Sequence, residues 1–525
     1  MGGLRPAPYQ LVALSKMIRG RTGGLLIADG VGVGKTISAG YIAHWVSTRL
    51  DGNVLVVCPP GLIEKWRMEM RQKFGIQANP IRSHEELVTA RAESRSGSHA
   101  FVYLLPSSRL DLPLELNFRC VIIDEIHNLR NRDTQSWRQA RKLTGTADWK
   151  IGLSATPINN SVADLANIFS LLLPAYDPLA VEATTEDLWT SREYGLLTPL
   201  ITRFTKEALG IQFSRRKAHT ISVRYPPLYA ERVRDVVQRL IKRNVQDGRY
   251  PLESITYFRE ASSSPRAFEK STGAQLGIVE DPKLEALERI LRDLARQVLV
   301  FCQFTETVEH LENALTDFAV YTLTGEVPVA DREAIIEAFR KRDKAVLLMT
   351  QVGSEGLDLQ FCDAVVNYDL HWNPMILEQR VGRIDRIGQS KPEITIYDFF
   401  VEGSIDARVL AVLGRKLRQL VGSPLDIKSP ESTEQPLWDA MSLRAEEESA
   451  RQTLESLELS ARLPAGDAQI LAAIPETACD PAKLVLLDSL SWLDGETTAS
   501  SQWLAEQADS EAEIVARLSR YQNVM

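Results

Sequence analysis

The chain has 525 residues, of which 44% are hydrophobic and 25% are charged. This length is too great for one ordinary domain and indicates about three units, while the composition is that of a soluble globular protein. The apolar stretches are no longer than strands, so we expect no membrane-spanning helix and no membrane partner. The N-terminal residues, MGGLRPAPYQ, lack the apolar core of a signal peptide, which argues against secretion and predicts a cytoplasmic protein.

The five cysteines are spread along the chain without a CxxC pair; they are Cys58, Cys120, Cys302, Cys362 and Cys479. Four of them lie in or beside apolar, strand-like stretches, where a buried thiol is the ordinary interpretation. The sequence therefore predicts no zinc site and a reducing environment.

Taken alone, the net charge of −8 argues against a nucleic-acid partner, but it is unevenly distributed. Residues 441–525 contain 15 acidic and 6 basic side chains, a local charge of −9, so the other 440 residues together carry +1. Residues 201–250 contain 12 Lys or Arg against 4 Asp or Glu, a local charge of +8. The acidity therefore belongs to the C-terminal part, and a basic segment in mid-chain could meet phosphates.

Short apolar runs alternate with helical patterns in two parts of the chain, which is typical of parallel sheets covered on both faces. The first series is Leu25–Asp29, Val54–Pro60, Phe101–Pro106, Cys120–Asp124 and Ile151–Ser154. The second series is Val298–Phe304, Val320–Thr324, Ala345–Thr350, Ala364–Tyr368 and Ile394–Phe399. The region between them, Tyr176–Glu280, is mostly helical by pattern and ends in a polar stretch, Ala261–Gly277. Strand signals stop after about Ser423, and polar helices are expected over Leu437–Leu463 and Ala499–Leu518.

A glycine-rich segment, residues 30–36, follows the first apolar run and precedes a helical pattern. Its glycines permit tight bends that turn backbone N–H groups toward a polyphosphate, and the helix N-terminus adds a positive dipole. Lys35 can reach the β- and γ-phosphates, and Thr36 can hold Mg²⁺. A glycine-rich turn without a ligand is the alternative, but the strand–loop–helix context favours phosphate binding. The predicted ATP-binding residues here are Asp29, Gly30, Gly32, Gly34, Lys35 and Thr36.

Asp124 and Glu125 stand at the C-terminal end of the apolar run that begins at Cys120. Ligands of open α/β sheets bind at this edge, so both acids are expected to face the phosphates. Asp124 suits Mg²⁺ coordination, and Glu125 suits activation of the attacking water. An acidic pair that ends a strand is common, and its position after a phosphate loop is what favours the catalytic interpretation.

A helix with an Asn-Pro start signal is predicted over residues 374–388. Arg383 and Arg386 are three residues apart and would share one face of it. Two guanidiniums directed across a cleft could neutralise the charge that develops on the γ-phosphate, as arginine fingers do. The alternative is a solvated basic face whose arginines pair with Glu378 and Asp385.

From about Pro8 to about Leu420, these motifs and their order resemble the Swi/Snf-type ATPases of helicase superfamily 2. The most specific match is the sequence Arg-Ile-Gly-Gln that begins at Arg386. Ile126 and Gly30 depart from the residues usual in the family, but neither change removes a metal or phosphate ligand. The other matching segments are Pro8–Gln10, Ala28–Thr36, Cys58–Trp66, Asp124–Asn131, Ser154–Asn160, Val300–Phe304, Thr350–Gln360 and Trp372–Gln379.

The resemblance implies an α/β fold with two tandem RecA-like parallel-sheet lobes, helical insertions between them and a helical C-terminal extension. We expect the ATP-binding first lobe, with a helical protrusion, over residues 1–212 and a basic linker with a helical insertion over residues 213–280. The second lobe is expected over residues 281–425 and an acidic helical module, which could dock a protein partner, over residues 426–525.

The resemblance also implies roles for further residues, since family members hold ATP between the lobes. ATP binding is implied for Gln10, Gly356 and Asp358, and coupling of hydrolysis to movement for Ser154, Ala155, Thr156 and Gln379. Contacts to the DNA along which family members move are implied for Pro60, Lys65, Thr350 and Trp372, although Trp372 could also be a core tryptophan. The basic run Arg215-Arg216-Lys217 could contact phosphate or be a solvated linker, and the sequence leaves both open.

The expected function is an ATP-dependent motor that uses ATP and Mg²⁺ to move along double-stranded DNA, nucleoid-associated if the source is bacterial. A strand-separating DNA or RNA helicase of superfamily 2 is the alternative, since it shares the ATP motifs. A scaffold that binds nucleotide without hydrolysis would need a broken motif, whereas Lys35, Asp124, Glu125 and both arginines are present. The segment Arg215–Arg224 resembles the bacterial branch that contains the polymerase-recycling ATPase.

Overall fold

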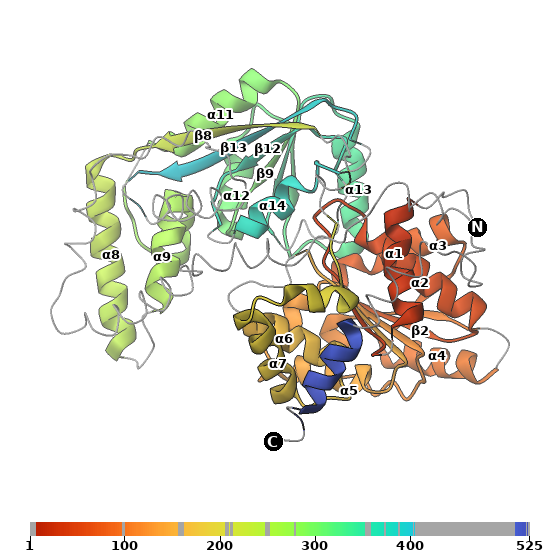
Figure 1. Cartoon of the computed structure of the whole chain (residues 1–525). Coiled ribbons are helices and arrows are strands. Elements are labelled where there is room, and N and C mark those ends of the chain that lie inside the picture. The colour runs from red at the N-terminus through yellow and green to blue at the C-terminus, as the bar shows by residue number, and fades with distance from the viewer. Residues whose placement is uncertain are drawn as a thin grey trace. The chain divides into compact units, whose positions relative to one another are not determined.

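The computed structural model describes residues 7–20, 22–96, 100–155, 162–204, 209, 214–246, 252–277, 280–351, 357, 359–371, 374–386, 389–402, 404, 510–520 and 522. They form two compact units (Figure 1). The first unit, here the first lobe, takes its described residues from 7–209 and 510–522. The second unit, here the second lobe, takes its described residues from 214–404.

The first lobe is built on a seven-stranded parallel sheet in the order β3-β4-β2-β5-β6-β1-β7. Its strands are β1 (Gly24–Ile27), β2 (Val54–Cys58), β3 (Ala78–Pro80), β4 (Val102–Pro106), β5 (Cys120–Ile123), β6 (Trp149–Leu153) and β7 (Ile201–Thr202). Its α-helices are α1 (Pro8–Arg19), α2 (Lys35–Arg49), α3 (Ile63–Phe74), α4 (His84–Ser96), α5 (Gln135–Thr144), α6 (Val162–Leu172) and α7 (Pro178–Thr190). Short 3₁₀ turns are η1 (Pro60–Leu62), η2 (Ser107–Arg109), η3 (Ile126–Leu129) and η4 (Tyr194–Leu200).

Both faces of the first sheet are buried, as its continuous apolar strands predict. Along β1, Leu26 belongs to one core cluster, whereas Leu25 and Ile27 belong to another. Alternate side chains of a strand point to opposite faces of its sheet, so the two clusters are the two covered faces.

The second lobe is built on a six-stranded parallel sheet in the order β10-β11-β9-β12-β13-β8. Its strands are β8 (Arg215–Val223), β9 (Gln297–Phe301), β10 (Val320–Leu323), β11 (Ala345–Met349), β12 (Ala364–Asn367) and β13 (Glu393–Val401). Its helices are α8 (Pro227–Gln246), α9 (Leu252–Ser263), α10 (Pro265–Thr272), α11 (Pro282–Leu294), α12 (Thr305–Ala314), α13 (Val329–Arg340) and α14 (Pro374–Val381). The helices α8 and α9 lie side by side at one end of this lobe (Figure 1).

All ten predicted strands are present, within a few residues of their predicted ends, and the two-sheet α/β architecture is confirmed. The sequence analysis missed β3, β7 and β8. Two of these are very short, but β8 pairs with β13 along nine residues, from Arg215 to Val223. It lies at the edge of the sheet and buries only Val223, so its sequence shows no apolar run. The prediction of a linker and helical insertion beginning at residue 213 is therefore wrong at β8, which is a strand of the second sheet.

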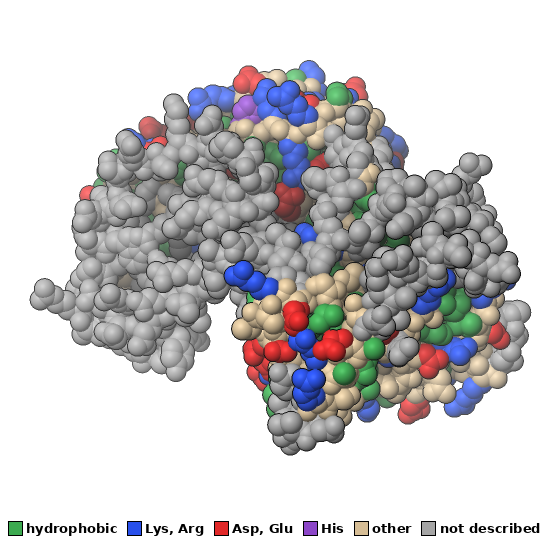
Figure 2. Space-filling view, viewed as in Figure 1, with side chains coloured by type: hydrophobic (Ala, Val, Ile, Leu, Met, Phe, Trp, Pro, Cys, Tyr) green, Lys and Arg blue, Asp and Glu red, His purple; other side chains and the backbone are tan. Residues whose placement is uncertain are grey.

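Residues 510–520 form a helix that packs on the first lobe, although the sequence analysis places them in a separate C-terminal module. Ile514 and Leu518 are 2% and 1% exposed and join a core cluster of that lobe. Arg517 forms ion pairs with Asp187 at 2.9 Å and Glu193 at 2.8 Å. Figure 1 shows the helix in blue beside α6 and α7, and Figure 2 shows acidic and basic side chains intermixed on this face. Most of the predicted module, including the helix predicted over Leu437–Leu463, lies outside the described residues.

The cysteines Cys58, Cys120, Cys302 and Cys362 are buried free thiols, as predicted. Within the described part of the chain, no helix combines the length and apolar character needed to cross a membrane.

Candidate nucleotide-binding and hydrolysis site

The strand order of the first lobe brings the predicted hydrolysis residues to one edge of the sheet. The phosphate loop, residues 30–36, follows β1, and the acidic pair Asp124–Glu125 follows β5. β6 lies between these two strands and delivers Ser154 directly after its last residue. Because the three strands are parallel, their carboxyl ends lie side by side, which is where open α/β sheets bind ligands.

The phosphate loop has the backbone that its glycines predict. Gly32 and Gly34 have φ angles of 82° and 101°, in the left-handed region that glycine enters without steric strain. Gly34 caps α2, whose first residue is Lys35. The Lys35 ammonium donates to the backbone carbonyls of Asp29 at 3.0 Å and Gly30 at 3.3 Å. The loop thus wraps around a cation at the N-terminus of a helix, where phosphate oxygens are favoured.

Asp29 supports the loop from the interior. Its side chain is 2% exposed, and its Oδ1 accepts a hydrogen bond from the Phe204 backbone N–H at 3.0 Å. The Gly30 N–H in turn donates to the Phe204 carbonyl at 2.8 Å. Burial raises the pKa of Asp29 to about 7, and the nearby Lys35 opposes this rise. The Asp29 carboxyl group therefore fastens the phosphate loop to the chain beyond β7.

The predicted adenine-reading residue, Gln10, lies in the first turn of α1 beside the loop. Its Oε1 accepts from the Ala7 N–H at 3.1 Å, and its Nε2 donates to the Tyr9 hydroxyl at 3.4 Å. The Tyr9 hydroxyl donates to the Val33 carbonyl in the phosphate loop at 2.7 Å. The start of α1 and the phosphate loop therefore form one hydrogen-bonded assembly.

Asp124 is fixed by both of its oxygens. Oδ1 accepts from the Glu125 N–H at 2.9 Å, and Oδ2 accepts from the Trp66 indole N–H at 2.8 Å. Trp66 itself is 1% exposed, so this donor is held rigidly by the core. Burial and then Glu125 raise the pKa of Asp124 to about 6, whereas the Trp66 hydrogen bond lowers it. In the sequence, Trp66 belongs to a segment that matches the family, Cys58–Trp66, and its contact with Asp124 was not predicted.

Glu125 has a φ of 49°, the left-handed conformation that is uncommon for a residue with a side chain. Its Oε2 is buried and has no hydrogen-bond partner among the described residues, although the His127 Nδ1 lies 3.3 Å away. His127 Nδ1 instead shares a hydrogen bond with the Ser154 hydroxyl at 3.0 Å. Burial lowers the pKa of His127 to about 4, so the ring is neutral at pH 7. One neutral imidazole thus lies between the acidic pair and the end of β6, close to Glu125 and hydrogen-bonded to Ser154.

The arginine segment of the second lobe, residues 378–386, differs from its prediction. The helix α14 ends at Val381, so Arg383 and Arg386 lie in the turns that follow and not on one helix face. Gly382 interrupts the helix, and the Arg383 N–H returns to the Arg380 carbonyl, three residues back, at 3.1 Å. The Arg386 guanidinium donates to the Gly382 carbonyl at 2.9 Å and to the Leu357 carbonyl at 3.1 Å.

Glu378 and Asp385 pair with a residue that the sequence analysis did not connect to them. Arg216, on β8, donates to both Glu378 oxygens at 2.8 and 3.0 Å. Its Nε and Nη2 donate to Asp385 Oδ2 at 2.9 and 2.7 Å. The sequence left open whether Arg216 is a solvated linker residue or a phosphate contact. In the structure it belongs to an ion-pair network within the second lobe.

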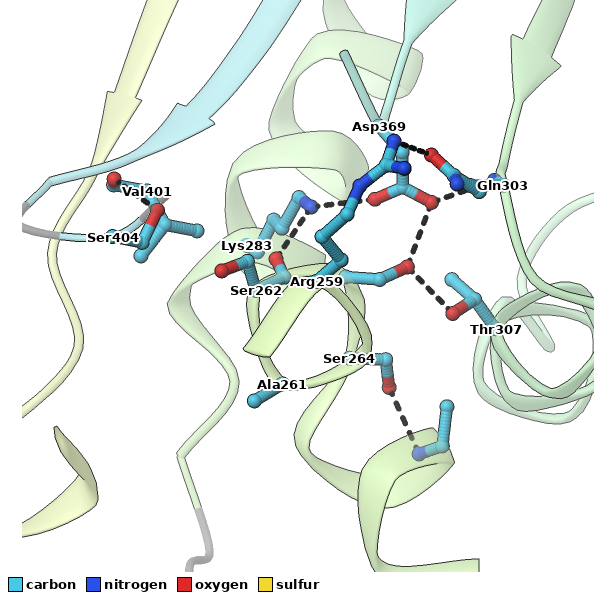
Figure 3. A network of polar contacts seen from close by, with 12 residues as sticks. Arg259, Ala261, Ser262, Ser264, Lys283, Gln303, Thr307, Asp369, Val401 and Ser404 are labelled. Carbon is cyan, nitrogen blue, oxygen red and sulfur yellow. Dashed lines mark hydrogen bonds and ion pairs between the residues drawn. The ribbon is translucent and has the colours of Figure 1, made fainter. Parts of the chain in front are cut away.

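A third arginine of the segment, Arg380, has a structural role. It is 2% exposed and donates to the Asn367 side chain at 3.1 Å and the Asp369 carbonyl at 2.8 Å. Asp369 also accepts from the fully buried Lys283 at 2.9 Å, and Lys283 donates to the Ser262 carbonyl at 2.8 Å. Figure 3 shows the part of this network around Asp369 and Lys283, which joins the ends of β9 and β12 to the helices α9, α11 and α12. Charged groups this deeply buried are stable only because they are paired.

For the remaining predicted residues, the structure gives the burial or a single contact. Pro60 is exposed, Lys65 is half-buried, and Thr350 is only 7% exposed. Gln379 accepts a hydrogen bond from Gln351 at 3.5 Å, and Ala155 is half-buried directly after Ser154. Thr36 is half-buried at the start of α2. Four predicted residues lie outside the described residues: Thr156, Gly356, Asp358 and Trp372.

Two family models match the chain in succession and together cover more than half of it. The SNF2-related domain matches residues 9–225, and the helicase conserved C-terminal domain matches residues 282–388. The chain belongs to the SNF2-related family of helicase-like ATPases. The narrower resemblance to the polymerase-recycling branch stays a prediction.

Relatives of this SNF2-related chain come from bacteria, plants and animals. It is 26% identical over 493 residues to the uncharacterized ATP-dependent helicase YqhH of Bacillus subtilis, a match that covers 86% of both chains. It is 25% identical to the ATP-dependent DNA helicase DDM1 of Arabidopsis thaliana, over 86% of this chain and 67% of that one. Against the chromodomain-helicase-DNA-binding protein 8 of Danio rerio, 26% identity covers 75% of this chain but 18% of that protein. The SWI2/SNF2 ATPase core of Sulfolobus solfataricus, solved in complex with dsDNA, matches with a TM-score of 0.36 and 19% identity, over 84% of this chain and 95% of that chain.

Proposed function

We propose that this chain hydrolyses ATP in response to DNA and moves along double-stranded DNA, without necessarily separating its strands. The observation that carries the hydrolysis part is the meeting of the phosphate loop, the Asp124–Glu125 pair and Ser154 at one sheet edge. The DNA part is supported by family membership and by relatives that are named as a DNA helicase and a DNA-binding helicase.

The donors of the first lobe fit ATP with Mg²⁺. The Thr36 hydroxyl and the Asp124 carboxylate are the hard oxygen ligands that Mg²⁺ prefers, and the ion would neutralise charge on the β- and γ-phosphates. Lys35 would exchange its two backbone carbonyl partners for phosphate oxygens. Gln10, beside the loop, is proposed to contact the adenine, and Gly356 and Asp358 are proposed to bind ATP, as the family resemblance implies.

Glu125 is the group proposed to activate water. A buried carboxylate oxygen without a hydrogen-bond partner among the described residues is suited to accept a proton from an attacking water. Because His127 is neutral and bonds to Ser154, a shift of Ser154, Ala155 and Thr156 would reach Glu125 through the imidazole. This connection, with Gln379 in the second lobe, is the proposed route that couples hydrolysis to movement.

Arg383 and Arg386 are proposed to stabilise the charge that develops on the γ-phosphate. Pro60, Lys65, Thr350 and Trp372 are the proposed contacts to the tracked strand. Thr350 is the weakest of these candidates, because its side chain is largely buried.

The test compares the ATPase rate of the full chain with duplex DNA, single-stranded DNA and RNA, together with a strand-displacement assay on a forked duplex. We expect duplex DNA to give the largest stimulation and the fork to stay paired. Efficient separation of the fork would instead favour the strand-separating helicase. Stimulation by RNA alone would support the proposed ATPase motor but contradict double-stranded DNA as its substrate.

A further inference from the structure

Arg216 connects the edge strand of the second sheet to the arginine segment through four hydrogen bonds. One guanidinium edge faces Glu378 on α14, and Nε with Nη2 faces Asp385 in the turn beyond it. The two carboxylates bracket the segment that carries Arg383. A single side chain therefore fixes both ends of the segment against β8.

The strand geometry explains why Arg216, and not its neighbours, reaches these carboxylates. Side chains of a strand alternate between the two faces of the sheet, so Arg215 and Lys217 point away from the face used by Arg216. The register pairs Arg216 with Ile394 of β13. The neighbouring basic residues are consequently matched controls with the same charge on the same strand.

The Asp385 carboxylate depends strongly on this partner. Its side chain is 1% exposed, whereas that of Glu378 is 36% exposed. A buried carboxylate is destabilised unless it is paired, and the rigid guanidinium fork can bind two carboxylates at once with more donors than a lysine ammonium has. Burial lowers the pKa of Arg216, but Glu378 and Asp385 raise it by more, so the side chain stays charged.

The position of Asp385 gives this pairing a consequence for hydrolysis. It lies between Arg383 and Arg386 in the chain, so a donor that holds its carboxylate also holds the turn on which both arginines stand. Arg216 is such a donor, because its Nε and Nη2 both donate to Asp385 Oδ2.

We propose that Arg216 is a positioning residue for ATP hydrolysis, which holds the arginine segment to β8 through Glu378 and Asp385. This inference rests on the proposed role of those two arginines. Because β8 is the first strand of the second lobe, it also ties the arginine segment to the start of that lobe.

The experiment measures kcat and KM for ATP at saturating duplex DNA, nucleotide binding and Tm for Arg216→Gln and Arg216→Lys. We expect Arg216→Gln to lower kcat by about tenfold or more, while KM changes less than about threefold. Arg216→Lys should give an intermediate kcat, because one ammonium restores the charge but not the fork. The matched controls Arg215→Ala and Lys217→Ala should keep kcat.

A double-mutant cycle with Asp385→Asn tests whether Arg216 acts through that carboxylate. The double variant should lose no more activity than the worse single variant, because two residues that act as one unit are not additive. The double variant also lacks the buried charge that Arg216→Gln leaves unpaired. If Arg216→Gln does not fold, the double variant and Arg216→Lys are measured in its place.

Three outcomes overturn the inference. The first is a wild-type kcat for Arg216→Gln, and the second is a loss of kcat that is additive with that of Asp385→Asn. The third is an Arg216→Gln variant that only needs a higher DNA concentration, as the loss of a phosphate contact would cause. The kcat of Arg383→Ala and Arg386→Ala is measured in parallel. It separates a failure of the Arg216 inference from a failure of the proposed function. If neither of those variants lowers kcat, the role of the arginine segment itself is wrong.

Discussion

The two lobes hold their proposed catalytic groups in different ways. In the first lobe, Asp124 and Glu125 directly follow β5, Lys35 begins α2 at the end of the phosphate loop, and most of their contacts are to backbone or to close neighbours. In the second lobe, Arg383 and Arg386 stand in turns beyond a short helix that side chains from remote strands hold in place. Geometry set by the backbone is robust to single substitutions, whereas geometry set by distant side chains can be lost with one of them.

The largest expected effect is on hydrolysis in the first lobe. Glu125→Gln should fold and bind ATP normally but lower kcat by about 10²–10⁴, because the amide cannot accept a proton from water. Lys35→Ala is the contrasting variant, since it should weaken both binding and turnover. A Glu125→Gln enzyme that turned over at the wild-type rate with DNA present would show that the acidic pair is not the hydrolysis site.

The second effect concerns stability in the second lobe. Lys283→Met should lower the free energy of unfolding by about 3–5 kcal/mol, because it leaves the Asp369 carboxylate buried without its charged partner. The double variant with Asp369→Asn should recover much of that loss, since both charges are then absent. Urea unfolding of the full chain measures both values, and equal stability of the single and double variants would contradict the network of Figure 3.

The third effect concerns the C-terminal helix. Leu518→Ala should lower the free energy of unfolding of the first lobe by about 2–5 kcal/mol, because it removes a side chain from the core. The exposed Arg520, on the same helix, provides the control variant Arg520→Ala, which should be neutral. Thermal unfolding that was the same for both variants would restore the interpretation of residues 510–520 as a separate module.

The smallest effect concerns Trp66 and the metal ligand. Trp66→Phe keeps an aromatic ring in the core but removes the hydrogen bond to Asp124, a contact worth about 1.5–3 kcal/mol when the acceptor is charged. We expect a several-fold higher Mg²⁺ concentration for half-maximal ATPase and a small change in Tm. An unchanged Mg²⁺ requirement would assign Trp66 to packing alone.

The contrast between the lobes also explains what the sequence could predict. The ten apolar strands and the phosphate loop were predictable because burial on both faces and glycine spacing leave local patterns. The strand β8 was not, since an edge strand that buries only Val223 resembles a polar linker. The Arg216 network was missed because it depends on contacts between residues more than 150 positions apart. The helix was predicted too long because the weak helix propensity of Gly382 was overlooked.

The central claim, movement along intact duplex DNA driven by ATP, is tested most directly by displacement of a third strand from a DNA triplex. The full chain, loaded on the duplex flanking the triplex, should release the third strand with ATP and Mg²⁺ and should fail to do so as Glu125→Gln. A forked duplex of the same sequence should stay paired under the same conditions. Release that proceeds equally well with Glu125→Gln, or without ATP, would contradict the claim.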